Sequence, residues 1–174
     1  SRWAQRLAYM AAVLLTTCVH GEQPAIVGSP VLRVVCTTFP VGLMTRNVTS
    51  EVSRVVVTLL VAANVGCPHE YVTSPADLRT LQSADVLVIN GLGMDTFTTP
   101  MLARVNKPPR VIDATEGIPG LITADLSEDK DGHAADAHAE NGLASGYDPH
   151  LFASPTMAAK MTRRIADGLA QADP

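Results

Sequence analysis

The chain has 174 residues, and its 47% hydrophobic and 17% charged content is that of a globular protein large enough for one packed core. It has a formal net charge of -4 and no Lys/Arg cluster beyond Arg163-Arg164, so it carries no electrostatic footprint for nucleic acid. The composition therefore argues against disorder throughout the chain and against nucleic acid as a partner.

Residues 1–21 have the layout of a secretory signal. Arg2 and Arg6 give a basic start, and the run from Leu7 to Leu15 is nearly all apolar but too short to span a membrane as a stable helix. The alternative is an amphipathic first helix of the fold, which would need the polar face that this run lacks.

The end of this segment, Leu15-Thr16-Thr17-Cys18, resembles the lipobox of bacterial lipoproteins, which makes Cys18 a candidate lipid anchor. Thr17 is larger than the Gly or Ala usual before that cysteine, so simple cleavage near Gly21 is the alternative. Either route predicts a bacterial protein that is periplasmic or anchored outside the cytoplasm, where disulfides persist.

After a spacer over residues 22–30, short β-branched strands alternate with helical segments. This alternation predicts an α/β fold, with right-handed crossovers and a parallel four-stranded sheet flanked by helices, over residues 31–153. The predicted strands are Val31–Thr37, Val55–Val61, Asp85–Asn90 and Arg110–Asp113. The predicted helices are Val41–Ser53, a segment that begins at Ser74-Pro75, Thr96–Val105, and residues 154–174.

The apolar patterns also predict how these elements are buried. Val55 to Val61 is almost uninterrupted, as expected of a strand covered on both faces. The helix Val41–Ser53 has Leu43, Val48 and Val52 near one face. Four apolar residues recur at helical spacing in the last helix and are expected to be core rather than a methionine metal box: Met157, Met161, Ile165 and Leu169.

Between residues 116 and 146 the apolar pattern dissolves into a His/acid-rich surface loop. Its histidines, His133 and His138, stand among five carboxylates, a composition that can gather divalent cations weakly. The alternative is a soluble linker whose histidines have no special role.

The two Pro-His steps of the ordered segments, Pro68-His69 and Pro149-His150, are the main candidates for metal ligation. Imidazole is the commonest side-chain metal ligand, and proline stiffens the adjacent backbone. His69 follows the second predicted strand, so it falls at the carboxyl edge of the sheet, where open parallel sheets form their sites. Imidazole ligands must lose their proton, so metal capture should weaken as the pH falls through about 6.5.

A zinc site needs three or four ligands, so the two histidines require further donors. Glu70, Asp95 and Cys67 are candidates, and solvated surface or helix N-terminal charge is the alternative for the two carboxylates. Cys67 could instead form a disulfide with Cys36, because both lie near the same end of adjacent predicted strands, or remain an inert thiol.

An enzymatic alternative is a catalytic zinc held by His69 and His150 with Glu70 as the base. The chain has no His-Glu-x-x-His spacing, no Gly-x-Ser-x-Gly elbow and no phosphate loop. Its Gly91-Leu92-Gly93 run lacks the third glycine of a dinucleotide fingerprint. A zinc-dependent hydrolase is therefore a minority interpretation.

The order of these segments resembles the zinc- and manganese-binding extracytoplasmic proteins of bacterial ABC transporters, the zinc-uptake and adhesin-lipoprotein family. The resemblance runs from about Val31 to the end of the chain, interrupted by a His/acid loop of the kind that zinc members often carry. The matching segments are Val34–Pro40, Pro68–Tyr71, Ser74–Leu78, Ala84–Asp95 and Asp148–Phe152.

The resemblance implies that His69 and His150 are the two metal ligands of an amino-terminal lobe. In relatives a long helix leads to a second lobe that supplies the remaining ligands, typically a histidine and a carboxylate. Residues 154–174 match the start of that helix, and the second lobe is expected to be absent from this chain. Cys67 departs from the family, in which aspartate or another residue without a thiol usually precedes Pro-His.

The function implied is capture of zinc, with manganese as the alternative, by a monomer that delivers it to the membrane permease of an ABC transporter. Zinc is favoured because the loop holds His133 and His138. The competing class is an adhesin-like surface lipoprotein, a cell-adhesion protein whose metal is structural.

Overall fold

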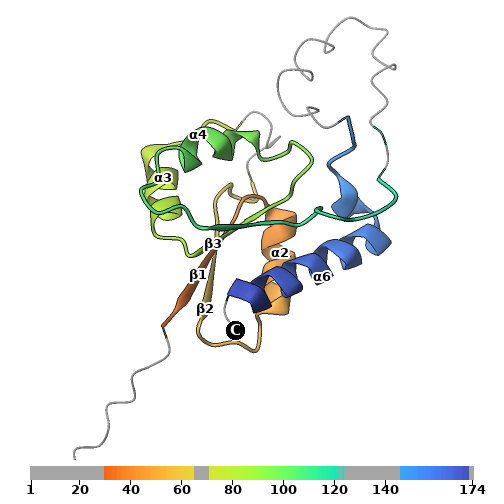
Figure 1. Cartoon of the computed structure of the whole chain (residues 1–174), viewed down its shortest axis with the longest axis horizontal. Helices are drawn as coiled ribbons and strands as arrows, with labels where there is room; N and C mark the ends of the chain where they lie inside the picture. The colour runs from red at the N-terminus through yellow and green to blue at the C-terminus, as the bar shows by residue number, and fades with distance from the viewer. Residues whose placement is uncertain (1–29, 65–70, 122, 124–145, 173–174) are drawn as a thin grey trace, which may run out of the picture.

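The computed structural model describes residues 30–64, 71–121, 123 and 146–172 (Figure 1). Four parallel strands form one sheet in the order β2-β1-β3-β4, as the alternation of strands and helices predicts. The strands are β1 (Leu32–Cys36), β2 (Val55–Leu59), β3 (Val86–Ile89) and β4 (Arg110–Asp113). The helices are α2 (Phe39–Val48), α3 (Pro75–Gln82), η2 (Thr96–Thr98), α4 (Thr99–Leu102), η3 (Leu151–Ala153) and α6 (Pro155–Ala172).

Strand β1 lies at the centre of the sheet and pairs with two neighbours. Val34 is in register with Val57 of β2 and with Val86 of β3, and its side chain is fully buried. β-Branched side chains pack well on a pleated, buried surface, which explains why this Val-rich segment forms the central strand.

The helices cover the sheet from both sides (Figure 1). On one face, Val34, Cys36 and Val88 pack with Val41 of α2 and with an apolar stripe of α6 formed by Met161, Ile165 and Leu169. On the other face, Val35 and Leu87 pack with Leu81 of α3 and Met101 of α4. The prediction that the α6 stripe is core is confirmed, because Met161 and Ile165 are fully buried.

Two burial predictions were wrong. Of the three residues expected on one face of the first helix, Val48 packs against the core, but Leu43 is 47% exposed and Val52 lies beyond the end of α2. The buried face of α2 is instead formed by Val41, Gly42 and Thr45. Strand β2 is at the edge of the sheet and leaves Val56 50% exposed, so one of its faces is open. A continuous apolar run does not reveal whether its strand is central or at an edge.

The predicted helix starts agree better with the structure. Ser74 accepts a hydrogen bond from the Asp77 amide while the Asp77 carboxylate accepts one from the Ser74 amide, a complete capping box. The helix predicted over Thr96–Val105 is shorter, a 3-10 turn followed by α4. None of the helices in the described ranges is long and apolar enough to cross a bilayer.

Helix α6 approaches β4 closely at Gly168. A Cβ atom at this position would lie 2.9 Å from two side-chain carbons of Ile112, well inside normal contact. The last turn of α6 is also tied to β4, because the Arg110 guanidinium donates to the backbone and side-chain oxygens of Gln171. Gly168 therefore sets how tightly α6 lies on the sheet.

We expect Gly168→Val to lower the free energy of unfolding by about 1–3 kcal/mol, because the added side chain must displace Ile112. Ala170→Val is the matched control, since Ala170 is exposed on the same helix and receives the same residue. Urea unfolding followed by circular dichroism measures both. An unchanged or higher stability of Gly168→Val would show that α6 does not pack on β4 in this way.

Candidate metal site at the carboxyl edge of the sheet

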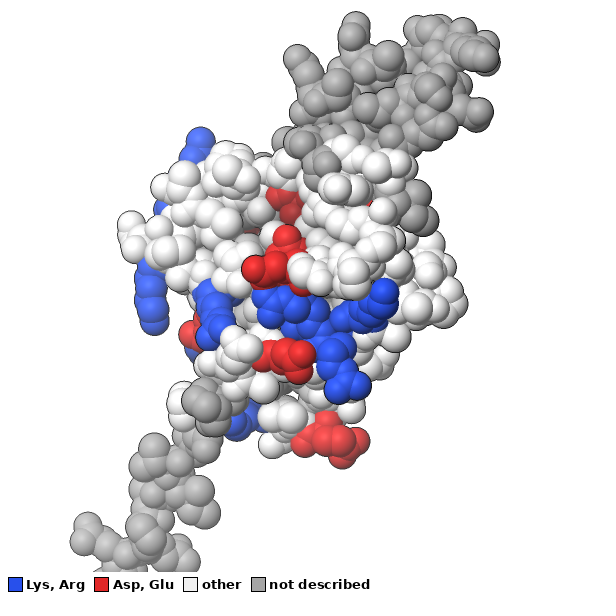
Figure 2. Space-filling view, turned by 45° about the vertical axis from the view of Figure 1, so that its right-hand side comes forward, with Lys and Arg blue, Asp and Glu red and all other residues white. Residues whose placement is uncertain are grey.

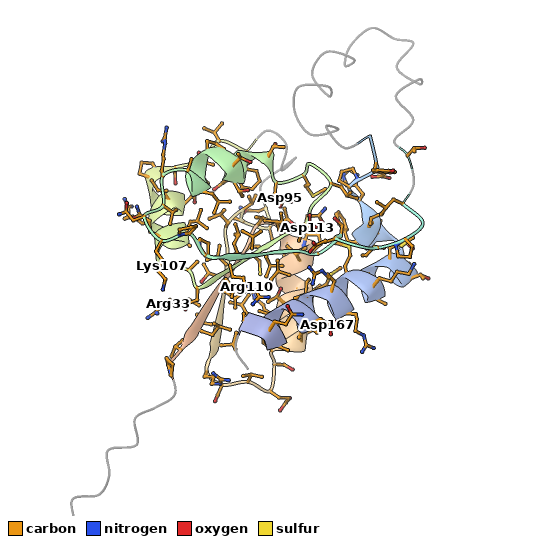
Figure 3. The ribbon with its side chains drawn as sticks, in the orientation of Figure 1. Arg33, Asp95, Lys107, Arg110, Asp113 and Asp167 are labelled. Atoms are coloured by element: carbon orange, nitrogen blue, oxygen red, sulfur yellow. The ribbon has the colours of Figure 1, made fainter. Side chains whose placement is uncertain are left out.

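Polar side chains gather where the four strands end. Because the strands are parallel, their carboxyl ends meet at one edge of the sheet, and this edge holds buried Thr37, Thr38 and Asn90. Asp95 and Asp113 lie at the same end of the sheet, opposite Arg33 (Figure 3). The core of the lobe is apolar, and most of its buried polar side chains lie at this edge.

The turn after β3 has an unusual backbone. Gly91, Leu92 and Gly93 all have positive φ, at 89°, 53° and 86°. Glycine adopts such angles without strain, whereas Leu92 must be held there by its surroundings. A Cβ at Gly91 would lie 2.2 Å from Asp113 Oδ1 and 2.2 Å from Thr115 Oγ1, so the end of β4 presses directly on this turn.

Asp95 is buried and bridges the same turn through its side chain. It is only 5% exposed, and its Oδ2 accepts a hydrogen bond of 2.7 Å from the Gly91 amide. Burial raises the pKa of Asp95, while hydrogen bonds from the Thr37 hydroxyl and from the amides of Gly91 and Asn90 act in the opposite direction. The structure thus places Asp95, a candidate metal ligand in the sequence, where it stabilises its own turn.

Asn90 connects this turn to the segment that carries His150. Its side chain is fully buried, and its Nδ2 donates to the carbonyl oxygen of Pro149 at 2.9 Å. The bond spans 59 residues of sequence and fixes the peptide immediately before His150. The second Pro-His step is therefore held beside the end of β3, at the carboxyl edge of the sheet.

The His150 ring is oriented by its own segment. Oδ1 of Asp148 accepts hydrogen bonds of 2.8 Å from both the backbone N and the Nδ1 of His150. The backbone amide and the imidazole of His150 hold the pKa of the Asp148 carboxyl below its usual range. An ionised carboxylate only accepts, so Nδ1 carries the proton and Nε2 is the nitrogen suited to coordinate a metal.

His69 lies outside the described residues, as do Cys67 and Glu70. Both flanks of the segment that contains them are well anchored. Before it, the Val61 amide bonds the Thr37 carbonyl oxygen at 3.0 Å; after it, the Tyr71 hydroxyl donates to Asp77 at 3.0 Å. The Tyr71 ring also meets Phe97 edge to face, with ring centroids 5.2 Å apart.

The loop histidines His133 and His138 lie outside the described residues as well. An antiparallel bridge between Thr123 and Tyr147 joins the two flanks of their segment. Cys36 is a free thiol buried in the core, and burial raises its pKa to about 11. Such a thiol is unreactive at neutral pH and suits packing rather than metal binding.

The described residues hold no group of three or more His, Cys, Asp or Glu side chains that could bind a metal. Acidic and basic side chains are interleaved on one face of the molecule (Figure 2). A shallow groove of about 420 Å³ lies between residues 116–119 and α6, and Glu116, Lys160 and Arg163 are among its lining residues. Arg164 and Glu116, which also line it, form an ion pair. This groove is separate from His150, which does not line it.

A four-stranded parallel sheet with helices on both faces is the fold of one lobe of the two-lobe solute-binding proteins. The family model for the periplasmic component A of zinc-uptake complexes matches residues 34–174, and the chain belongs to this family. The resemblance inferred from the Pro-His segments is therefore confirmed.

Similar proteins include the zinc-binding lipoprotein AdcA of Streptococcus pneumoniae, 30% identical over 164 residues that cover 94% of this chain and 30% of AdcA. The high-affinity zinc uptake system protein ZnuA of Bacillus subtilis is 28% identical over 82% of this chain and 43% of its own length. The chain thus spans less than half the length of these relatives.

Solved structures show the same fold. Zn(II)-bound AdcA from Streptococcus pneumoniae aligns with a TM-score of 0.63 at 27% identity, covering 83% of this chain and 27% of that chain. FpvC from Pseudomonas aeruginosa in complex with Ni²⁺ aligns with a TM-score of 0.63 at 26% identity, covering 83% and 44%.

Two residues of this site, Asn90 and Asp148, were not assigned a role by sequence reasoning. A signal for Asp148 existed, because an acceptor two residues before a candidate histidine ligand can bond its ring. Asn90 gave no comparable signal, since its partner is distant in sequence.

We expect the neutral His150 imidazole to carry its proton on Nδ1, because Asp148 accepts from that nitrogen. Nitrogen-15 NMR at about pH 8, above the ordinary imidazole pKa of about 6.5, distinguishes the two ring nitrogens. Asp148→Ala should shift the ring toward a mixture of tautomers. The control Asp167→Ala removes an exposed carboxylate from α6 and should leave the spectrum unchanged. A parent ring protonated on Nε2 would contradict the assignment.

Proposed function

We propose that this chain captures extracytoplasmic zinc, with manganese as the alternative, for delivery to the membrane permease of an ABC transporter. The observation that carries the proposal is the placement of His150 at the carboxyl edge, with its Nδ1 bonded to Asp148 and its backbone fixed by Asn90. An imidazole oriented through its second nitrogen is the usual form of a metal-ligating histidine.

His69 is proposed as the second ligand. Its segment follows β2, and Leu60 and Val61, at the end of that strand, bond the backbone oxygens of Cys36 and Thr37 at the end of β1. In a parallel sheet this is the edge at which Asn90 holds Pro149. The segment of His69 thus follows a strand that ends at the edge where Pro149 is held, and this order supports a metal ion shared by the two Pro-His steps.

Further ligands are proposed to come from a second lobe of the kind that the family resemblance implies. The metal is cargo in this account and leaves unchanged, so the protein is proposed to be a carrier rather than an enzyme. The names of the relatives support zinc, and the Ni²⁺-bound neighbour is compatible with a site that accepts other divalent ions. His133 and His138 are proposed as an auxiliary gatherer of zinc.

We also propose that the protein is located outside the cytoplasm and that a lipid on Cys18 anchors it to the membrane. An extracytoplasmic carrier needs export, which the layout of residues 1–21 provides, and Cys18 would tether it close to the permease. These residues lie outside the described part of the chain, so the proposal is supported by their sequence and by the lipoprotein relative. The carrier is proposed to act as a monomer.

The double variant His69→Ala/His150→Ala should lose zinc affinity by more than the roughly 10–100-fold that changes around metal ligands usually cause, because it removes two donors. Isothermal titration measures the affinity of each protein. The matched control, His133→Ala/His138→Ala, also removes two imidazoles and should retain the tightest binding event. Equal affinity of the parent and the His69/His150 variant would show that zinc binds elsewhere.

A further inference from the structure

Asn90 is the buried polar side chain that joins the end of β3 to the segment of His150, through its Nδ2, while its Oδ1 has no partner among the described residues. It ends β3, is fully buried, and donates from Nδ2 to the Pro149 carbonyl at 2.9 Å and to the Gly91 carbonyl at 3.3 Å. Pro149 is itself buried, and its carbonyl accepts this bond in place of water. A buried amide and a buried carbonyl that bond each other are both costly to separate.

The residues around Asn90 restrain the turn that follows it. The turn that follows it is closed by Asp95, whose Oδ2 accepts from the Gly91 amide, and is pressed by Asp113 and Thr115 at the end of β4. Asp113 is fixed in turn, because its Oδ1 accepts from both the amide and the hydroxyl of Thr115 at 2.8 Å. Figure 3 shows Asp95 and Asp113 together at this end of the sheet.

The Pro149 peptide leads directly into His150, so its position sets where the imidazole begins. Asp148 controls the rotation and tautomer of the ring, whereas Asn90 controls the location of the backbone that carries it. The proline restricts the backbone between these two points. His150 is therefore held by a contact from the sheet, made by Asn90, and by a contact within its own segment, made by Asp148.

We propose that Asn90 is a positioning residue for metal capture, whose carboxamide bond to Pro149 holds His150 at the carboxyl edge of the sheet before the metal arrives. This inference rests on the proposed role of His150 as a ligand. Without the bond, the backbone next to His150 would become ordered only when the metal binds. The loss of conformational entropy would then make the binding free energy less favourable.

Asn90→Leu tests the inference, because leucine is close to asparagine in size but cannot donate a hydrogen bond. Zinc affinity by isothermal titration should fall about 10–100-fold, the usual effect of losing a residue that orients a metal ligand. Thr45→Val is the matched control: it removes another fully buried bond, from Thr45 Oγ1 to the Val41 carbonyl at 2.7 Å, within α2. It should lower stability while leaving zinc affinity unchanged.

A double-mutant cycle with His150→Ala distinguishes a loss of affinity through the position of His150 from a loss through general destabilisation of the fold. If Asn90 acts through His150, Asn90→Leu should cause less than about a twofold further loss of affinity in the His150→Ala background. Asn90→Ser is measured in the same cycle, so the test does not depend on the leucine variant folding.

Equal losses in both backgrounds, or no loss in the parent background, would overturn the inference while leaving His150 as a ligand. An unchanged affinity of His150→Ala alone would instead reject the proposed site, and the inference with it. The two failures are distinguished by the single His150 variant.

Discussion

Parallel pairing of β1 with both of its neighbours is the constraint on which the site depends. It directs the ends of all four strands to one edge, so that segments far apart in the sequence meet there. The pairing is stabilised by burial of Val34, Val35 and Cys36 on alternating faces between two layers of helices. A strand that was not apolar on both faces could not occupy the centre of this sheet.

The carboxyl edge combines rigidity with polarity. Burying a polar group is unfavourable unless it is hydrogen-bonded, and a chain of contacts meets this requirement at the edge in part, while Thr38 Oγ1, Asn90 Oδ1 and Asp95 Oδ1 stay buried without a partner among the described residues. Thr115 bonds Asp113, Asp113 lies against Gly91, the Gly91 amide bonds Asp95, and Asn90 reaches Pro149. The result is a scaffold that holds the backbone before His150 beside the end of β3.

Much of the sheet could be predicted, because each strand is a short β-branched run between turn signals and the alternation with helices implies parallel pairing. The position of β2 at the edge of the sheet could not be predicted. A strand that is exposed on one face can have the same apolar composition as a strand that is buried on both faces. Likewise, Leu43 was expected on the buried face of α2, whereas the small residues Gly42 and Thr45 meet the sheet.

The sequence predicts His69 and His150 as metal ligands, and it says less about the residues that support them. His150 stood out through its Pro-His context, and its Asp148 partner is two residues away. Asn90 depends on a contact across 59 residues, which only the folded topology creates. His69 remains a prediction from the sequence and from the family resemblance.

We propose that His69 and His150 share one zinc ion. The most direct measurement is nitrogen-15 NMR of the histidine side chains during titration with zinc. If the two histidines share the ion, the imidazole signals of His69 and His150 shift together with the first equivalent, before those of His133 and His138. A first equivalent that shifts the two loop histidines and leaves His150 unchanged would contradict it.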